Sequence, residues 1–147
     1  MNYTIYSDGA YSRRNNEGAF AFVILNTDSG SEVMRMAGKI KEETNNRAEL
    51  KAIIAAVHSL PHDATHVRIV SDSMYALNTL SGQWRRSSNK DLFKLWEWRV
   101  MRFMEDVEFE WCFVKGHSGD YYNELCDRIC TEKLGYDPKK EYEKFLN

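Results

Sequence analysis

The segment GAFAFVILNTDSGSEVMRMAGKI, residues 18–40, decides which kind of fold this chain can form. Its first part, Gly18 to Leu25, is free of charge and predicts a strand, and its last part, Glu32 to Ile40, predicts a returning strand. Between them stand Asn26-Thr27-Asp28-Ser29-Gly30, residues that favour a tight turn. The segment therefore predicts two antiparallel strands joined by a turn.

Before this hairpin the sequence predicts a further strand, and after it the spacing of apolar residues changes to that of a helix. Residues Tyr3 to Ser7 alternate loosely and predict a strand that ends at Asp8-Gly9, which extends the hairpin into a meander. From Asn45 to Leu60, apolar residues recur at spacings of three and four, which predicts a helix capped by Thr44 or Asn45. The later predictions are a strand from His66 to Val70, a short helix from Ser73 to Leu80, a helix from Lys90 to Glu105, a strand from Val107 to Val114, a helix from Tyr121 to Leu134, and a tail from Lys139 to Asn147 that is a short helix or frayed.

This order of elements places the chain in the α/β class. Three strands built as a meander, followed by alternating helices and strands, imply a mixed sheet with helices on its faces. The chain has two prolines, neither of them in a linker, and no repeats or low-complexity stretches. A single domain over residues 1–147 is therefore predicted.

Composition is that of an ordinary globular protein. Hydrophobic residues make up 43% of the 147 positions and charged residues 29%, which excludes a disordered chain, and no apolar run is long enough to span a bilayer. The first residues lack the basic and then apolar pattern of a secretory signal. The three cysteines are an odd count without framework spacing, which indicates a reducing compartment and predicts a cytoplasmic protein. Cys126 and Cys130 could hold a metal, but burial as small side chains explains them better.

Four carboxylates stand where ordinary surface acids do not. Asp8 and Asp72 end predicted strands, Glu49 lies early in a helix, and Asp127 sits among apolar residues of a late helix. An unpaired buried carboxylate is costly, and open α/β sheets bind ligands at the carboxyl ends of their strands. Four acids that meet there would hold Mg²⁺ or Mn²⁺, and two such ions can drive phosphodiester hydrolysis. Helix caps and surface salt bridges are the alternative for each acid taken singly.

The segments around these acids resemble the type 1 ribonuclease H family. They are Tyr6-Ser7-Asp8-Gly9, Thr44-Asn45-Asn46-Arg47-Ala48-Glu49-Leu50, Val70-Ser71-Asp72-Ser73, and Val114-Lys115-Gly116-His117-Ser118-Gly119 followed by Asn123-Glu124-Leu125-Cys126-Asp127. The resemblance covers nearly the whole chain and implies Asp8, Glu49, Asp72 and Asp127 as ligands of two Mg²⁺ ions, with Mn²⁺ as a possible substitute. It also implies a five-stranded mixed sheet whose first three strands are antiparallel. The implied activity is hydrolysis of the RNA strand of RNA–DNA hybrids, which leaves 5′-phosphate and 3′-hydroxyl ends.

His117 lies in Gly116-His117-Ser118-Gly119, where the flanking glycines predict a loop that can move. A mobile imidazole near two metal ions could donate a proton to the leaving 3′ oxygen or help the product depart, and the resemblance implies a role of that kind. An exposed loop histidine without a role is the alternative. His58, His62 and His66 are evenly spaced, but Pro61 interrupts the helix between them, so a zinc site is not expected there.

Asn45 and Asn46 are candidate readers of the substrate. Either could simply cap the helix, but two amides in succession also suit a nucleic-acid groove, where they can read the 2′-hydroxyls that distinguish RNA from DNA. The resemblance places both asparagines in the minor groove of the hybrid and Thr44 near a DNA phosphate.

Residues 84–90, WRRSSNK, are locally basic and contain an aromatic side chain. Trp84, Arg85 and Arg86 are candidates to hold a phosphate backbone, with Trp84 packed on a sugar or base. A solvated loop in which Trp84 is a core anchor is the equal alternative. In the helix that follows, the predicted apolar face is Leu92, Leu95, Trp96, Val100 and Phe103, and the tryptophans expected in the core are Trp96, Trp98 and Trp111.

Three departures from the family pattern concern the substrate surface. The connection Arg85 to Asp91 is short where many bacterial members carry a longer basic protrusion, so affinity is either lower or carried by Arg85, Arg86 and Lys90. The loop Ala10 to Glu17 lacks the usual Gly/Pro-rich pattern, and Met74 stands where a glutamine is common. None of these departures removes a metal ligand.

Rival functions remain open at this point. A DNA-directed nuclease of the same fold would share the scattered acids but not the asparagine pair, and a small-molecule phosphatase would not need that pair. A non-catalytic hybrid-binding module would not need all four acids. The net charge of −2 argues weakly against a nucleic-acid partner, but metal ions held by the acids would cancel it locally. The chain is expected to act as a monomer, without a membrane partner.

Overall fold

A computed structural model describes residues 1–41 and 44–135, and its centre is a five-stranded mixed sheet in the order β3-β2-β1-β4-β5. β1 pairs antiparallel with β2, and β2 pairs antiparallel with β3. β4 pairs in parallel with β1 on one side and with β5 on the other. The predicted fold class is therefore confirmed, including the antiparallel meander. The strands are β1 (Asn2–Ser12), β2 (Glu17–Asn26), β3 (Glu32–Ile40), β4 (His66–Ser71) and β5 (Glu108–Phe113).

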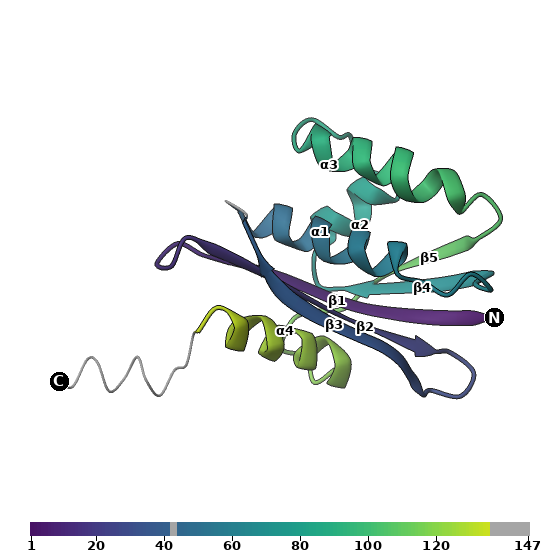
Figure 1. Cartoon of the computed structure of the whole chain (residues 1–147), viewed down its shortest axis with the longest axis horizontal. Coiled ribbons are helices and arrows are strands. Elements are labelled where there is room, and N and C mark those ends of the chain that lie inside the picture. The colour runs from purple at the N-terminus through teal and green to yellow at the C-terminus, as the bar shows by residue number, and fades with distance from the viewer. Residues whose placement is uncertain (42–43, 136–147) are drawn as a thin grey trace.

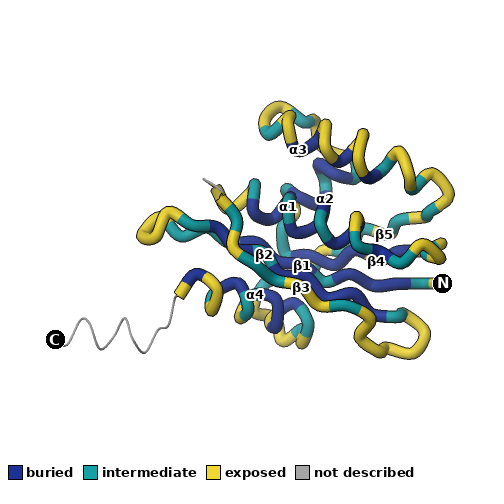
Figure 2. Tube along the Cα trace, viewed as in Figure 1, coloured by how far each residue is buried: buried dark blue, intermediate teal, exposed yellow. Residues whose placement is uncertain are grey.

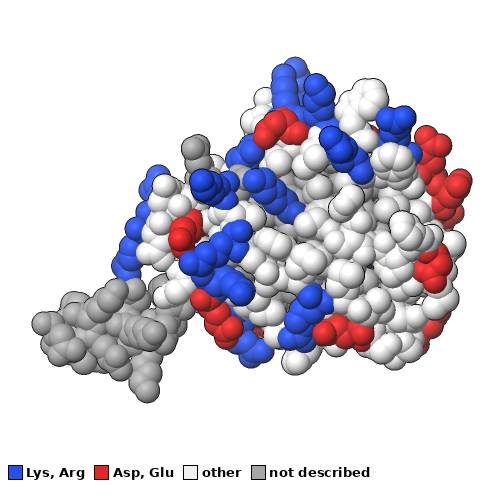
Figure 3. Space-filling model, viewed as in Figure 1, with Lys and Arg blue, Asp and Glu red and all other residues white. Residues whose placement is uncertain are grey.

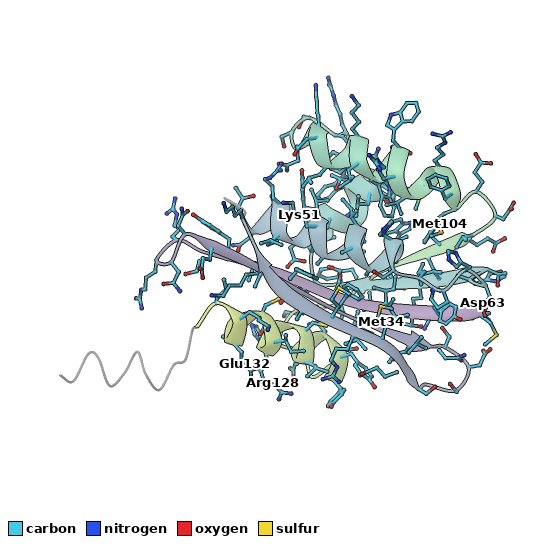
Figure 4. All side chains as sticks on the ribbon, viewed as in Figure 1. Met34, Lys51, Asp63, Met104, Arg128 and Glu132 are labelled. Carbon is cyan, nitrogen blue, oxygen red and sulfur yellow. The ribbon has the colours of Figure 1, made fainter. Side chains whose placement is uncertain are left out.

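Helices cover both faces of this sheet, as predicted. Figure 1 shows α1, α2 and α3 on one face and α4 on the other. The side chains follow the same division, because Lys51 and Met104 lie on the first side of the sheet and Arg128 and Glu132 on the second (Figure 4). The helical elements are α1 (Asn45–His58), α2 (Met74–Leu80), α3 (Lys90–Leu95), a π-helical turn (Trp96–Val100), a 3₁₀ turn (Met101–Phe103) and α4 (Tyr121–Lys133).

The core has two parts, one on each face of the sheet. Successive residues of a strand point to opposite faces, so the long central strands supply both parts. On the α1 side, Ile5 and Ile24 pack with Ile53 of α1, and on the α4 side, Val23 packs with Cys126 and Cys130. Figure 2 shows β1 buried along most of its length between these two layers. β1 is thus the strand around which the molecule is organised.

The first strand is longer than predicted, and its predicted end at Asp8-Gly9 was wrong. β1 continues to Ser12 and keeps its pairing with β2 throughout, with Asp8 opposite Ala21 and Ser12 opposite Glu17. The pairing partner supplies the backbone hydrogen bonds that carry the strand past a glycine. Asp8 therefore lies inside a strand and is held on a rigid backbone.

The helix predicted from Lys90 to Glu105 is regular only in its first half. After Leu95 the backbone widens into the π-helical turn, which changes the number of residues per turn and so rotates the following side chains. Trp96 and Val100 are buried as predicted, but Leu95 and Phe103 are exposed. The prediction for Trp98 was also wrong, since 61% of this residue is exposed.

The remaining boundaries agree with the sequence to within one or two residues. Ser73 caps α2 by accepting a hydrogen bond from the backbone of Ala76, as the sequence predicted. The longest helix in residues 1–41 and 44–135, α1, has 14 residues, and none of the helices described there has the length and apolarity needed to cross a membrane. The tail predicted over residues 139–147 lies outside the described residues.

Candidate active site

The parallel pairing of β1 with β4 brings Asp8 and Asp72 to the same edge of the sheet. The register places Ile5 beside Ile69 and Tyr6 beside Val70, so each strand carries an aspartate two residues after the last of these pairs. Asp8 is buried and Asp72, just past the end of β4, is partly buried. Ligands bind at this position in open α/β sheets, where parallel strands end together.

Glu49 reaches the same place because α1 packs unusually close to β1. Residue 9 is a glycine, and a Cβ atom there would collide with the backbone of Ala48 and Glu49. The Gly9 N–H donates a hydrogen bond of 3.2 Å to Oε1 of Glu49. Oε2 of Glu49 is buried and has no hydrogen-bond partner among the described residues. One oxygen of Glu49 is therefore held in place and the other remains available to a ligand.

The three carboxylates form a compact group. Asp8, Glu49 and Asp72 can each offer one oxygen such that all three oxygens lie within 4.8 Å of one another. Burial, together with the charges of Asp72 and Asp127, raises the pKa of Asp8 to about 7. Burial also raises the pKa of Glu49, and the neighbouring charge of Asp8 adds to this effect. Burial and the charge of Asp127 raise the pKa of Asp72. Ionisation of these three carboxyl groups is therefore disfavoured in the metal-free protein.

This donor set fits a hard divalent cation. Carboxylate oxygens are the ligands that Mg²⁺ and Mn²⁺ prefer, and a cation would compensate the charges that disfavour ionisation. Glu49 offers a buried oxygen without a partner, which a metal ion would satisfy. The residues present therefore suit a divalent metal ion.

Asp127 lies near this group but is not one of its three members. It is partly buried in α4, and its charge contributes to the raised pKa values of both Asp8 and Asp72. Two thiols fix α4 against β1, since Cys126 contacts the carbonyl oxygen of Tyr6 at 3.7 Å and Cys130 contacts that of Asp8 at 3.4 Å. The cysteines are buried small side chains, as expected, and burial raises the pKa of the Cys126 thiol to about 12.

The loop that carries His117 runs beside Asp72. A Cβ atom on Gly116 would lie 3.2 Å from Oδ2 of Asp72, so the backbone of this loop packs against the carboxylate. His117 is exposed and adopts a left-handed backbone with φ of 57°. The charge of His117 lowers the pKa of Asp72, although burial still raises that pKa overall. His117 is thus close enough to the carboxylates to interact with them.

The start of α1 presents three polar residues next to the carboxylates. Thr44 is the helix cap, because its hydroxyl accepts a hydrogen bond of 3.1 Å from the backbone N–H of Arg47. The side chain of Asn45 accepts a bond of 2.8 Å from the backbone N–H of Tyr11, which leaves its amide hydrogens free to donate. Asn46 is exposed. Since Thr44 fills the capping position, neither asparagine is needed for it.

The basic segment after α2 divides into outward and inward side chains. Trp84 is 47% exposed, so its interpretation as a core anchor was wrong, and Arg85 is exposed beside it. Arg86 points inward and donates hydrogen bonds to the carbonyl oxygens of Thr79 and Leu80 and to Glu97. These contacts give Arg86 a structural role that the sequence did not reveal.

Other surface features lie apart from the carboxylates. A groove of about 1050 Å³ runs between α1 and the end of the π-helical and 3₁₀ segment, with Lys51, Arg99 and Phe103 among its lining residues, and none of the four acids lines it. On the face shown in Figure 3, Lys and Arg side chains spread over the parts formed by α1, the start of α3 and the β1–β2 turn, with a few acidic side chains among them. Further acidic side chains lie along the opposite edge of this face.

Sequence reasoning missed two residues that organise the site. The sequence indicated Gly9 only as the end of a strand, whereas it permits the contact between α1 and β1. Arg47 is part of a family motif for which the sequence indicated no role, and it makes two hydrogen bonds from α1 to Asp91 in α3. Both residues lie beside predicted ligands, and this proximity was the available signal.

Known proteins resemble this chain in sequence over almost its whole length. The family model described as RNase H matches residues 1–134. A Ribonuclease H of Treponema denticola is 32% identical over 155 aligned residues, which cover 90% of this chain and 96% of that protein. A Ribonuclease H of Acetivibrio thermocellus is 32% identical over 147 aligned residues, which cover 93% of this chain and 97% of that protein.

Solved structures resemble the chain in fold. The N-terminal RNase H domain of a Mycobacterium tuberculosis protein superimposes with a TM-score of 0.77 at 20% identity and covers 96% of this chain and 99% of that one. RNase H1 from the archaeon Halobacterium salinarum gives a TM-score of 0.73 at 25% identity, covering 93% of this chain and 100% of that one. The first of these similarities concerns the fold alone.

Proposed function

The chain belongs to the ribonuclease H family, and we propose that it hydrolyses the RNA strand of RNA–DNA hybrids with two bound metal ions. The observation that carries the proposal is the group formed by Asp8, Glu49 and Asp72, whose oxygens lie within 4.8 Å of one another. Their raised pKa values support the proposal, because a bound cation would favour the ionised carboxylates that burial disfavours. The relatives named Ribonuclease H support the substrate class.

In this proposal Asp8, Glu49, Asp72 and Asp127 hold two Mg²⁺ ions, for which Mn²⁺ can substitute. When bound, the two ions activate the attacking water and stabilise the leaving oxygen of the phosphodiester. The rigid strand under Asp8 and the close contact between α1 and β1 fix the carboxylates before substrate arrives. The products are a 5′-phosphate and a 3′-hydroxyl.

His117 supplies the proton for the leaving 3′ oxygen or assists product departure. Its loop packs against Asp72, so a short movement of the exposed imidazole brings it to the reacting phosphate. Asn46 and the free amide hydrogens of Asn45 read the minor groove of the hybrid, where the 2′-hydroxyls of the RNA lie. Thr44 lies near a phosphate of the DNA strand.

Trp84 and Arg85 extend this surface along the nucleic-acid backbone. Both are exposed on the same short segment, and an aromatic next to a cation suits a sugar and its phosphate. Arg86 is left out of the proposed surface, because its guanidinium is bound within the protein. All of the proposed ligands and contacts come from one chain, so the monomer is the proposed active form, which light scattering can check.

The test uses four end-labelled substrates: RNA–DNA hybrid, double-stranded RNA, double-stranded DNA and single-stranded RNA. Each is incubated with the protein and Mg²⁺, with and without EDTA, and the cleaved strand and its ends are identified. Asp8→Asn is the inactive variant, and Asp28→Asn, in an exposed turn far from the site, is its charge-matched control.

The expected result is cleavage confined to the RNA of the hybrid, stopped by EDTA and by Asp8→Asn but not by Asp28→Asn. Cleavage of DNA would move the activity to another branch of the fold while keeping the metal site. An active Asp8→Asn protein would contradict the metal site itself.

A further inference from the structure

Arg47 joins the start of α1 to the start of α3. It lies in the first turn of α1, three residues after the cap Thr44, and its side chain is only 24% exposed. Nη1 donates to Oδ1 of Asp91 at 2.9 Å, and Nη2 donates to Oδ2 at 2.7 Å. This is a two-pronged arginine–carboxylate pair, the geometry in which such a pair is strongest and most directional. The pair lowers the pKa of Asp91 to about 2.

The same guanidinium also binds Asn89, the residue that precedes α3. Nη1 of Arg47 donates to Oδ1 of Asn89 at 3.2 Å, and the side-chain amide of Asn89 donates to the hydroxyl of Tyr75 in α2 at 2.8 Å. Asn89 has a left-handed backbone, with φ of 58°, and its carbonyl oxygen accepts the N–H of Leu92 at 3.0 Å. Arg47 therefore connects the first turn of α1 to both α2 and α3.

Contacts with α2, α3 and Arg47 hold the segment between α2 and α3, residues 81–89, in place. Near its middle, the backbone N–H of Trp84 donates to the carbonyl oxygen of Asn78, and Arg86 donates to Thr79 and Leu80. The guanidinium of Arg86 also lies over the ring of Phe93, 4.9 Å from its centroid. At the far end, Asn89 is tied to Arg47. Trp84 and Arg85 are the large side chains that this anchored segment exposes.

We propose that Arg47 is a positioning residue that sets the segment 81–89 against the start of α1, so that the two halves of the hybrid-binding surface form one rigid unit. The inference rests on the proposed function, which places Asn45 and Asn46 on one half and Trp84 and Arg85 on the other. Side chains and loops that are ordered before binding do not have to be immobilised during it, and affinity rises accordingly. The short segment thus takes its shape from Arg47.

Two other roles for Arg47 make different predictions. If Arg47 binds a phosphate itself, removal of Asp91 should tighten binding, because it removes the carboxylate that competes with the phosphate for the guanidinium. If Arg47 only stabilises the fold, removal of either partner should leave the affinity for hybrid unchanged. The positioning role alone predicts weaker binding after loss of Asp91.

The experiment measures the dissociation constant of a fluorescently labelled RNA–DNA hybrid by anisotropy, in an Asp8→Asn background that keeps the hybrid intact in Mg²⁺. The variants are Arg47→Met, Asp91→Ala and the double substitution. Arg35→Met is the matched control, because Arg35 forms a comparable ion pair of 2.7 Å with Glu32 on the distant edge strand β3. Hydrogen exchange of residues 81–89 in the free variants reports on the order of that segment.

Arg47→Met and Asp91→Ala are each expected to weaken binding by about twofold to tenfold, as expected when one or two side chains lose their order. The double variant should bind within about twofold of the weaker single variant, because both remove the same contact. In the active protein, KM should rise while kcat changes by less than about twofold. Amides in residues 81–89 should exchange faster in both single variants, and Arg35→Met should resemble the parent.

Unchanged or tighter binding by Asp91→Ala would overturn the positioning role, even if the parent protein cleaves hybrid as proposed. Failure of the parent protein to bind or cleave any hybrid would instead remove the proposed function. In that case hydrogen exchange still decides whether Arg47 orders the segment, and unchanged exchange in Arg47→Met would overturn the inference by itself.

Discussion

Among single residues, Asp8 and Glu49 are buried carboxyl groups whose ionisation the fold disfavours. Burial raises the pKa of each carboxyl group, and the charge of Asp8 raises the pKa of Glu49 further. Desolvation is the first cause of both shifts, which means that the position of the residues in the fold determines their pKa values. The group therefore destabilises the metal-free fold when it is ionised, and in the proposed function a bound cation would offset that cost.

The metal-free protein should therefore lose stability as the pH rises. The pKa of Asp8 is about 7 in the folded protein, against 3.8 for the solvent-exposed group of an unfolded chain. A raised folded-state pKa contributes stability that is complete below the unfolded value and is lost as the pH rises through the folded value. Asp91 does not contribute to the change in stability between pH 5 and 8, because its pKa is lowered to about 2 and it stays ionised over this range.

Urea unfolding in EDTA checks this expectation. The free energy of unfolding should fall by roughly 1–3 kcal/mol between pH 5 and pH 8. A metal-free protein that is equally stable or more stable at pH 8 would contradict the raised pKa of Asp8.

Asp8→Asn should remove most of this pH dependence. The amide has nearly the size of the carboxylate and no charge, so the metal-free variant should be more stable than the parent at pH 8 by roughly 1–2 kcal/mol, and about equal to it at pH 5. Cleavage of hybrid should be lost at the same time. Thermal unfolding in EDTA and the hybrid assay together measure the two effects, and Asp28→Asn should change neither.

At the scale of elements, the contact between α1 and β1 places Glu49 beside Asp8. Gly9 allows the helix backbone to lie against the strand, and no side chain fits between them. The helix begins at Thr44, whose cap fixes its first turn close to the same contact. The distance between these two elements, more than the length of either, decides whether the carboxylates meet.

Gly9→Ala tests this distance. The added methyl group meets backbone atoms of Ala48 and Glu49 that cannot rotate away, so α1 must shift, at a cost of about 1–3 kcal/mol or more. Hybrid cleavage should fall by more than about tenfold, because Glu49 moves with the helix. Gly38→Ala is the control, since its methyl group meets only the ring of Phe20, and it should leave cleavage nearly unchanged. Calorimetry and initial rates measure the two effects.

The π-helical turn after α3 contains two tryptophans, Trp96 and Trp98, that the sequence predicted to lie in the core. Trp96 is fully buried and meets Trp111 edge-on, with ring centroids 6.1 Å apart, whereas Trp98 is 61% exposed. Trp96→Ala should cost about 3–5 kcal/mol of unfolding free energy, and Trp98→Ala should change it by less than about 0.5 kcal/mol. Denaturant unfolding of the two variants gives the comparison, and equal losses would contradict the burial of Trp96 and the exposure of Trp98.

At the scale of the whole molecule, the proposed metal site joins elements that are far apart in the chain. Its ligands come from β1, α1, the end of β4 and α4, and the hydrophobic layers on both faces of the sheet hold these elements together. A metal ion bound there would link both layers. In the proposed function, metal binding would therefore be coupled to global stability.

Mg²⁺ should therefore raise the melting temperature of the protein at pH 8. A ligand that binds only the folded state at a hundred times its dissociation constant adds about 2.7 kcal/mol. The increase should be smaller at pH 5, where protons compete for Asp8, and reduced in Asp8→Asn. A scanning-calorimetry titration measures it, and the absence of any shift with Mg²⁺ or Mn²⁺ would count against the metal site.

The sequence by itself determined the local elements and the candidate chemistry. Alternation and periodicity are properties of neighbouring residues, so the hairpin of residues 18–40, the helix that starts after Thr44 and the cap at Ser73 could be predicted. The identity of Asp8, Glu49, Asp72 and Asp127 as unusual acids also came from their immediate neighbours. These inferences needed no knowledge of which elements pack together.

The tertiary structure alone decided how those parts meet. The end of β1 depends on its pairing with β2, the inward course of Arg86 depends on carbonyl oxygens at the end of α2, and the exposure of Phe103 follows a widened helical turn. The ion pair of Arg47 with Asp91 spans 44 positions of the chain. Each of these outcomes is set by contacts between residues that are distant in the chain. The pattern of neighbouring residues does not contain these contacts, so it could not predict them.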